Sequence, residues 1–332
     1  MSEPKPSADV PEPSPAEPVP APPRKVSLAK RFRRELRVRA LLVFRPLLAL
    51  LPWRLAGALG AGVGRLAYFL VPKERALALA HLQLAFPDWT DARRKQVARQ
   101  AFGHLGRSAL EVIAVRKVQA RLADEVLLGP DETALLAAAK ASGKGALVVA
   151  CHVGNWELMA RRLAHEGIDC ATVAREAQDP RLTRLLEDSR ADAGVKTLWR
   201  GRPGLAKDML RLLRDGGFLG LLIDQDTDVQ GQFVPFFGRP AFTPRAAGDL
   251  AVRTGAWVLF ACAHREADGR HRVVLRRVPV PETGDREADA LAVTAAATAE
   301  IEREIRLRPD EWVWMHRRWK RQPDSPERPA IR

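Results

Sequence analysis

Cysteine is scarce in this sequence. Only three of the 332 residues are cysteines, and Cys151, Cys170 and Cys262 are an odd number spread far apart. That pattern argues against a disulfide framework, and the start of the chain shows no cleavable signal pattern. We therefore expect a reducing, cytosolic location.

Long apolar runs are also lacking. The most apolar stretch, residues 40–71, is interrupted by charged residues and prolines: Arg45, Pro46, Pro52, Arg54 and Arg65. No window reaches the roughly 18 uncharged residues of a membrane-spanning helix. The pattern favours two helices in the membrane interface, with Trp53 and Tyr68 at headgroup level. A pair of core helices with a solvated basic flank is the alternative, and the sequence leaves open whether the stretch spans the bilayer or lies on it.

Acidic residues are too few to balance the basic ones. The chain has 54 Lys and Arg against 40 Asp and Glu, which gives a net charge of +14. Such a surface attracts nucleic acid, anionic lipid headgroups or an acidic carrier protein. Motifs of interleaved basic and aromatic residues, typical of nucleic-acid binding, are missing. We expect an anionic membrane surface as partner and no nucleic acid.

Composition divides the chain into three parts. Residues 1–23 hold about nine prolines and little apolar surface, so we expect a disordered tail. Residues 24–72 are predicted to form a membrane-associated segment on the cytoplasmic face, because a basic run directly precedes the apolar stretch. The run consists of Arg24, Lys25, Lys30, Arg31, Arg33, Arg34, Arg37 and Arg39. Residues 73–325 remain for a single catalytic domain without internal repeats.

Helical and strand patterns alternate along this domain. Helical spacing covers residues 88–119, with an N-cap at Trp89-Thr90-Asp91, and continues at 131–142, 204–214, 243–253 and 288–308. Short apolar strands are predicted at 146–151, 170–174, 218–223 and 257–263, and another strand is predicted at 271–278. The alternation predicts an α/β fold in which helices cover a central sheet.

Reactive side chains appear where the first buried strand ends, in the segment Ala150-Cys-His-Val-Gly-Asn-Trp-Glu157. Ligand sites of open α/β sheets lie at such carboxyl ends. His152 is suited to accept a proton near neutral pH, and Glu157 is the nearest carboxylate to orient it. The two side chains can meet only if the chain bends between them, which Gly154 allows. Asn155 can cap the helix that follows, and the free backbone amides at the start of that helix can face an oxyanion. The alternative is an interior histidine beside a solvated acid.

Metal chemistry has little support in the sequence. The segment offers two ligands and lacks the His-Glu-x-x-His order that places two imidazoles on one helical face. Asp224, Asp226 and Asp228 alternate like the start of a calcium loop, but Val229 and Pro235 stand where that loop requires Gly and Glu. We expect neither a metal nor another cofactor.

His152-Val-Gly-Asn-Trp-Glu157 resembles the His-x4-Glu motif of the bacterial lipid A biosynthesis acyltransferases, the late lauroyl and myristoyl transferases. These are related to glycerolipid acyltransferases, which carry His-x4-Asp. Four further blocks resemble the family in the same order, over roughly residues 40–321: Gly201-Arg-Pro-Gly204, Ile223-Asp-Gln-Asp226, Val234-Pro-Phe-Phe-Gly-Arg-Pro240 and Trp312-Val-Trp-Met-His-Arg-Arg-Trp-Lys320. Five ordered blocks are far more specific than a single motif.

The resemblance implies an acyltransferase domain with a central mixed sheet, preceded by membrane-associated helices. It implies transfer of a fatty acyl chain from an acyl carrier protein thioester to a hydroxyl of a lipid A precursor or similar glycolipid, at the cytoplasmic face of the inner membrane. His152 would be the general base and Glu157 its partner, while Arg190 and Asp224 fall where the family has functionally important residues. Acyl length, acceptor identity and oligomeric state stay open.

Other polar residues are candidates for substrate binding. Arg190 could hold an anion through its planar guanidinium, and its alternative is a surface helix arginine. Arg175, after the strand at 170–174, and Arg202, before a helix, are candidates for phosphate or carrier contact, although such arginines are more often structural. Gln225 adjoins Asp224 in the same block and joins the candidates.

Aromatic residues in the later blocks have two interpretations. Phe236 and Phe237 are candidates for an acyl-chain groove and are equally suited to packing a loop onto the core. Trp312, Trp314 and Trp319 either anchor at the membrane interface or pack beneath a basic face.

The expected mechanism is direct transfer. His152 removes the proton of the acceptor hydroxyl, the oxygen attacks the thioester carbonyl, and amide or arginine donors stabilise the oxyanion. Cys151 is a candidate nucleophile for a covalent route, but its place in an apolar strand predicts an inert thiol. The alternatives are another acceptor (phospholipid, glycolipid or aminolipid) and a non-catalytic basic membrane-surface scaffold.

Overall fold

The computed structural model describes residues 28–323. The expected disordered tail, residues 1–23, and the first two basic residues lie outside the described residues. Contacts divide the chain between Val43 and Phe44, and α1 (Leu28–Leu50) crosses this boundary. The features below belong to the larger unit, from Phe44 onward.

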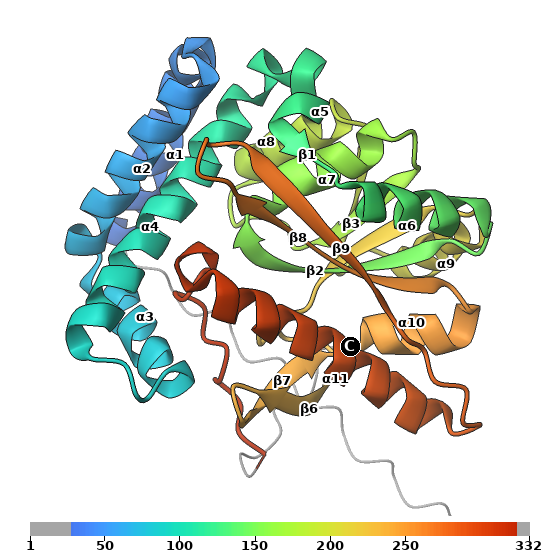
Figure 1. The fold of residues 1–332 in the computed structure, drawn as a ribbon. Coiled ribbons are helices and arrows are strands. Elements are labelled where there is room, and N and C mark those ends of the chain that lie inside the picture. The colour runs from blue at the N-terminus through green and yellow to red at the C-terminus, as the bar shows by residue number, and fades with distance from the viewer. Residues whose placement is uncertain (1–27, 324–332) are drawn as a thin grey trace, which may run out of the picture. The chain divides into compact units, whose positions relative to one another are not determined.

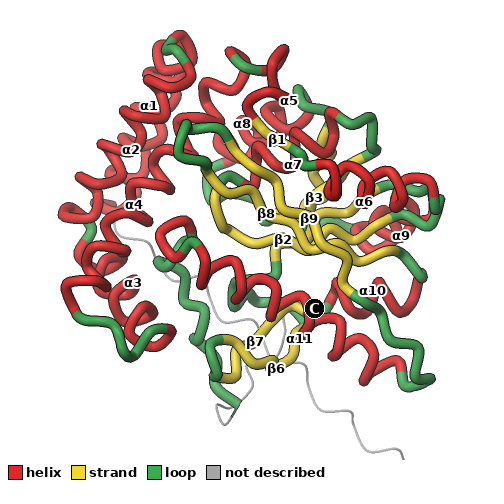
Figure 2. The backbone as a smooth tube through the Cα atoms, in the orientation of Figure 1, coloured by secondary structure: helices red, strands yellow, loops and turns green. Residues whose placement is uncertain are grey.

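A seven-stranded sheet forms the centre of this unit, in the order β1-β9-β8-β2-β5-β3-β4 (Figures 1 and 2). β9 runs antiparallel to β8, and all other neighbouring strands are parallel. The mixed α/β sheet that the sequence predicts is confirmed. Its strands are β1 (Val126–Leu127), β2 (Ala146–Gly154), β3 (Cys170–Ala174), β4 (Val195–Trp199), β5 (Phe218–Leu222), β8 (Trp257–Arg265) and β9 (His271–Val278).

Helices cover both faces of the sheet (Figure 1). Val148 and Ala150 of β2 pack in a core with α6 (Pro130–Ala141) and α7 (Trp156–His165). Leu147 and Val149 face a second core with α10 (Ala246–Thr254) and α11 (Arg286–Leu307). A strand buried on both faces must be apolar at every position, which explains the continuous run in β2. The remaining helices of this domain are α5 (Leu122–Glu125), α8 (Pro180–Ala191) and α9 (Leu205–Arg214), with 3-10 turns η1 (Val115–Lys117), η2 (Gln119–Arg121) and η3 (Pro309–Glu311).

A separate two-stranded hairpin was not predicted from the sequence. It consists of β6 (Gly231–Phe236) and β7 (Arg239–Pro244), joined by a turn in which Phe237 and Gly238 both have positive φ. The expected helix at 243–253 begins at Ala246 instead, because Thr243 and Pro244 belong to β7. Prolines in both strands hid the hairpin, since proline weakens any strand pattern. β4 and α8 were also missed.

The segment preceding the sheet is a helical layer. α2 (Trp53–Leu70), α3 (Pro72–Ala85) and α4 (Asp91–Ala114) follow α1, and Thr90 caps α4 by accepting a hydrogen bond from the Arg93 N–H at 3.3 Å, as predicted. Trp53 and Tyr68 are buried rather than exposed, so the expectation that they lie at headgroup level is not met. Among the described residues no single helix is long and apolar enough to cross a membrane. The bent pair α2 and α3 passes that test together, by length and composition only.

Candidate active site

The ends of two neighbouring strands bring His152 and Asp224 together. β2 and β5 are parallel and in register up to the pair Ala150 and Leu222. His152 and Asp224 each lie two residues beyond that pair, so the register places them side by side although they are 72 positions apart in the sequence. Both stand at the carboxyl edge of the sheet, where the sequence predicts the site.

His152 is held by Asp224 through two hydrogen bonds. Its Nδ1 lies 2.7 Å from Asp224 Oδ1, and its backbone N–H donates to Oδ2 at 2.7 Å. Trp312 Nε1–H also donates to Oδ2, at 2.8 Å. Burial alone would raise the pKa of Asp224, but the charge and hydrogen bonds of His152 hold that pKa well below its usual range. An ionised carboxylate only accepts, so the Nδ1 of His152 carries a proton and the ring's lone pair is on Nε2, the atom that can accept a proton.

Glu157 pairs with Arg190 and not with His152. The Glu157 carboxylate accepts from Arg190 Nε at 3.0 Å and Nη2 at 2.6 Å, and both side chains are largely buried. The predicted contact between Glu157 and His152 is therefore wrong. The physical reason is that His152 ends a strand and turns toward the neighbouring strand, whereas Glu157 lies in the first turn of α7 and points to α8. The predicted bend between them does not bring the two side chains together.

The bend itself is formed as predicted. Gly154 has a φ of +64°, and a Cβ at this position would lie 1.8 Å from the carbonyl oxygen of Ala263. Only glycine fits such a position. Asn155 caps α7, because its Oδ1 accepts from the Leu158 N–H at 3.3 Å.

A buried glutamate holds the residue that follows this bend by a hydrogen bond. Glu111 of α4 accepts from Asn155 Nδ2 at 3.1 Å and from both terminal nitrogens of Arg265 at 2.6 and 2.7 Å. Burial would raise the pKa of Glu111, but the hydrogen bond of His271 and the charge of Arg265 lower it to about 2. No sequence signal pointed to Glu111, since it lies in a helical pattern far from the motif.

Gln225 and a second histidine complete the surroundings of His152. The amide nitrogen of Gln225 lies 3.1 Å from both ring nitrogens of His152 and 2.5 Å from His316 Nε2. The rings of His152 and His316 have centroids 5.1 Å apart. Burial, and next the charge of His152, lower the pKa of His316 to about 4, so this imidazole is neutral near pH 7. The only sequence signal that pointed to His316 was its position in the block 312–320, which resembles the family.

An apolar cavity of about 40 Å³ lies between α7 and the sheet. Val148, Leu163 and Phe218 are among its apolar lining residues, and Glu157 and Arg190 provide a polar part of its wall. Trp156 also lines it and packs its ring edge-on against His152, with centroids 4.7 Å apart. Nη1 of Arg190 is buried without a hydrogen-bond partner among the described residues. Trp156 therefore lies between this cavity and His152.

The other predicted binding residues lie apart from His152. Arg175 follows β3 and is exposed; Arg202 follows β4 and is bound to Glu176 Oε1 at 2.7 and 2.9 Å. Phe236 is fully buried against Trp312 and Trp319, and the cavity under α7 is lined by other residues. Phe237 stacks edge-on with Phe86 and lines a surface pocket beside Arg239. Packing thus accounts for the position of Phe236, whereas the binding roles of all four residues stay predictions.

Two further expectations are answered by burial. Trp312, Trp314 and Trp319 are all buried, which confirms the packing interpretation. Cys151 is fully buried on the other face of β2 from Val148, and burial raises the pKa of its thiol well above the usual value. A protonated, inaccessible thiol is a poor nucleophile.

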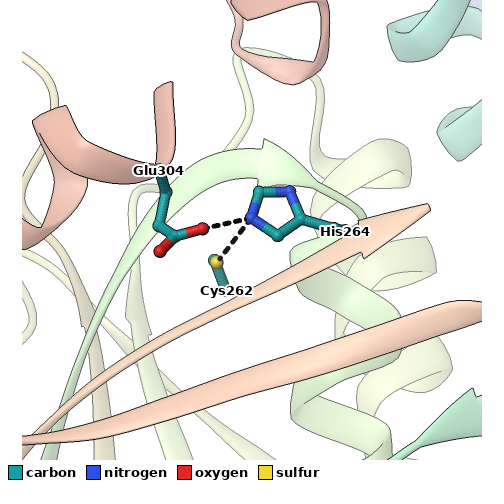
Figure 3. Close-up of side chains that lie close together, drawn as sticks. All are labelled: Cys262, His264 and Glu304. Atoms are coloured by element: carbon teal, nitrogen blue, oxygen red, sulfur yellow. Dashed lines mark hydrogen bonds and ion pairs between the residues drawn. The ribbon is translucent and has the colours of Figure 1, made fainter. Parts of the chain in front are cut away.

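A second buried polar group lies under α11 (Figure 3). His264 Nε2 contacts the Glu304 carboxylate and lies 3.6 Å from Cys262 Sγ, an arrangement with the ligand types of a metal site. Glu304, however, also pairs with Arg276. Burial lowers the pKa of His264, but the hydrogen bonds of Cys262, Glu304 and Glu311 outweigh it and raise the pKa overall. These residues form an ion-pair network between β8, β9 and α11.

The acids that imitate a calcium loop also have protein partners. Asp226 accepts from the backbone N–H of Arg321 at 2.8 Å, and Arg321 also contacts Asp228 at 3.4 Å. Asp224 is bound by His152 and Trp312. The carboxylates are therefore committed to hydrogen bonds and ion pairs.

Chemically, the site is a general base beside a narrow apolar chamber. Nε2 of His152 can take a proton from a hydroxyl, and the Asp224 carboxylate stabilises the imidazolium that forms. The cavity is too small for a whole fatty acyl chain, and Arg190 holds in its wall a donor that has no partner within residues 28–323.

Comparison with known proteins agrees with this chemistry. A family model described as bacterial lipid A biosynthesis acyltransferase matches residues 29–321. The lipid A biosynthesis lauroyltransferase of Escherichia coli K12 is 26% identical over 281 residues, which are 83% of this chain and 88% of that protein. The palmitoleoyltransferase of the same organism is 26% identical over 82% of this chain and 87% of its own length. A phosphatidylinositol mannoside acyltransferase of Mycobacterium tuberculosis is 29% identical over 60% of this chain and 61% of that protein.

Proposed function

The chain belongs to the bacterial lipid A biosynthesis acyltransferase family, and we propose that it transfers a fatty acyl chain from an acyl carrier protein thioester to a hydroxyl of a lipid A precursor or similar glycolipid. The observation that carries the proposal is the His152–Asp224 pair at the end of the central strands. The Nε2 of His152 provides the base that activation of a hydroxyl requires.

The proposed reaction is a direct transfer. The acceptor oxygen attacks the thioester carbonyl as its proton passes to Nε2 of His152. The oxyanion collapses, the thiolate leaves, and the imidazolium returns its proton to the sulfur. Asp224 stabilises the imidazolium in both steps, and no covalent enzyme intermediate is required. We assign Glu157 a positioning role, in which it holds the Arg190 guanidinium in the cavity wall.

The cavity beneath α7, about 40 Å³, is proposed to receive only the end of the acyl chain, because its volume admits no more than a few carbon atoms. Support comes from its lining, which is apolar apart from the Glu157–Arg190 pair, and from Trp156, which connects it to His152.

The site of action is proposed to be the cytoplasmic face of the inner membrane. α2 buries small residues and exposes large apolar ones: Leu55, Leu59, Val63, Leu66, Phe69 and Leu70. Arg54 and Arg65 are exposed on the same helix. An apolar face flanked by cations suits a helix lying in an anionic membrane interface.

A different glycolipid is the second candidate acceptor. The relatives named phosphatidylinositol mannoside acyltransferase share 29% identity with this chain over part of its length. Their acceptor also presents sugar hydroxyls on a membrane lipid, so the same base and cavity would serve.

The test is an in vitro transfer assay with radiolabelled acyl–acyl carrier protein and a detergent-solubilised lipid A precursor. His152→Ala is expected to abolish transfer, and Asp224→Asn to reduce kcat by roughly 10²- to 10⁴-fold, the usual scale of general base catalysis. Glu157→Gln should lower the rate by less, because Glu157 contacts Arg190 and not His152.

Cys151→Ala is the control for the covalent route. The variant is expected to keep most of the activity, since the thiol is buried and protonated. Complete loss of transfer in a folded Cys151→Ala protein, or undiminished transfer by Asp224→Asn, would contradict the mechanism. His152-dependent labelling of other bacterial lipids, with none of the lipid A precursor, would move the acceptor to the second candidate.

A further inference from the structure

Two arginines stand side by side at the carboxyl edge of the sheet, with no acidic partner among the residues that the structure describes. Arg175 directly follows β3 and Arg200 directly follows β4, and the two strands are parallel and in register up to Ala174 and Trp199. The Arg200 N–H donates to the Ala174 carbonyl at 2.8 Å, which extends the pairing to this point. Throughout residues 28–323, neither guanidinium has a hydrogen bond or an ion pair.

The two cations act on each other. The pKa of Arg200 is lowered, first by its partial burial and next by the charge of Arg175, while Asp228 acts in the opposite direction. Asp228 is itself in contact with Arg321 at 3.4 Å. Two like charges held together by strand register are stabilised when an anion binds between them.

Other arginines at this edge have their partners within the fold. Arg202, only two residues from Arg200, is bound to Glu176, and Arg190 is bound to Glu157. Arg202 and Arg190 are thus neutralised by glutamates, although the whole chain is basic. Within the described part of the chain, Arg175 and Arg200 differ from them in having no ion pair.

The pair lies within reach of the reaction. The strand order β2-β5-β3-β4 places Arg175 two strands from the strand of His152 and Arg200 three strands away. Strands are spaced by about 4.8 Å, so the separations along the edge are about 10 and 14 Å. A phosphate bound there would be separated from the reacting carbonyl or hydroxyl by a linker or a sugar, not attached to it directly.

We propose that Arg175 and Arg200 together form a binding site for a phosphate group of one of the two substrates. Planar guanidinium groups offer the paired donors that phosphate oxygens accept. The inference rests on the proposed acyl transfer, in which phosphate is present in the pantetheine arm of the donor and in a phosphorylated glycolipid acceptor.

The experiment compares substrates with and without their phosphate. The donor arm uses lauroyl-4′-phosphopantetheine against lauroyl-pantetheine, and the acceptor arm uses a lipid A precursor before and after removal of its phosphates. The enzymes are the wild type, Arg175→Gln, Arg200→Gln and the control Arg253→Gln. Arg253 is exposed in the last turn of α10, which precedes the amino end of β8 and therefore lies away from the carboxyl edge of the sheet. The control removes the same charge and is expected to behave like wild type.

In one arm, each site variant should raise the KM for the phosphorylated substrate at least about tenfold, as expected for a charged hydrogen bond, with kcat within about twofold. The KM for the substrate without phosphate should not change. The arm in which this happens identifies the source of the phosphate. Equal KM changes for both forms, or none in either arm, would overturn the proposal.

A binding measurement separates this proposal from the proposed function. Calorimetric titration with inorganic phosphate needs no turnover, and the double variant Arg175→Gln/Arg200→Gln should bind at least tenfold more weakly than wild type and Arg253→Gln. A wild type without transferase activity but with this difference would sink the proposed function and keep the phosphate site. Equal phosphate binding by all three proteins would overturn the site.

Discussion

At the residue scale, the burial of His316 links the stability of the protein to pH. Its imidazole is packed beside His152 and Gln225, and its pKa is lowered to about 4 from the ordinary histidine value of 6.5. As the pH falls from 6.5 to 4, the unfolded chain binds a proton at this residue that the folded protein does not. The free energy of unfolding therefore decreases through this window.

His316→Gln should remove that dependence. We expect the wild type to lose up to about 3 kcal/mol more than the variant between pH 7 and pH 4, at 1.4 kcal/mol per pH unit. Urea unfolding at both pH values measures the difference. The exposed His165→Gln, near the end of α7, serves as the matched control and should follow the wild type. Parallel losses in wild type and His316→Gln would contradict a neutral, buried His316.

At the same scale, the assignment of the carboxylate partner depended on distance in space. Glu157 is five positions from His152 and Asp224 is 72 away, yet Asp224 is bonded to the ring. From the sequence, His152 and Asp224 could each be recognised as lying at the end of a buried strand. Which strands are neighbours, and in what register, follows from packing of the whole sheet, and that information decides the contact.

At the element scale, the contact between α2 and α4 depends on glycine. A Cβ on Gly64 would lie 2.1 Å from the Phe102 carbonyl oxygen, and one on Gly60 would lie 2.3 Å from that of Gly106. The two helices therefore pack backbone to backbone. This close approach explains why α2 presents glycine and alanine to α4, while its leucines, Val63 and Phe69 are exposed.

Gly64→Ala should destabilise the protein by at least about 2 kcal/mol, because the helices must separate to admit the methyl group. A methyl group on Gly62 of the same helix would meet no described atom within 4 Å, so Gly62→Ala should be neutral or stabilising by up to about 1 kcal/mol. Midpoints of chemical unfolding measure both variants. A Gly64→Ala protein as stable as Gly62→Ala would show that the close approach of the helices is absent in solution.

At the scale of the whole molecule, net charge and the exposed face of α2 act together on membranes. The full chain has a charge of +14, and Leu59 and Leu66 are 44% and 57% exposed on α2. Apolar insertion and electrostatic attraction should therefore both contribute to binding of an anionic bilayer.

Leu59→Ser/Leu66→Ser should weaken binding to vesicles of phosphatidylcholine and phosphatidylglycerol at least about tenfold, since each buried leucine contributes roughly 1.5–3 kcal/mol. Sedimentation with vesicles at low and high salt measures both contributions, and high salt should weaken binding of all proteins. Leu307→Ser, an exposed leucine at the end of α11, is the control and should bind like wild type. Undiminished binding by the double variant would place the membrane contact elsewhere.

The sequence by itself determined the family, the alternation of helices and strands, and the position of the base. Short, mainly apolar runs predicted β2, β3, β5 and β8 nearly to their ends, because strands buried on both faces carry few polar residues to blur the signal. The Gly154–Asn155 bend was also predictable, since backbone conformation and helix capping are local properties.

Only the tertiary structure decided which side chains meet. The pairing of His152 with Asp224, of Glu157 with Arg190, and of Arg175 with Arg200 follows from strand order and helix direction, which no local pattern contains. The burial of Trp53 and Tyr68 likewise depends on the approach of α4 through its glycines. Local periodicity reports which face of an element is buried, whereas the identity of the partner is set by free energy summed over the entire core.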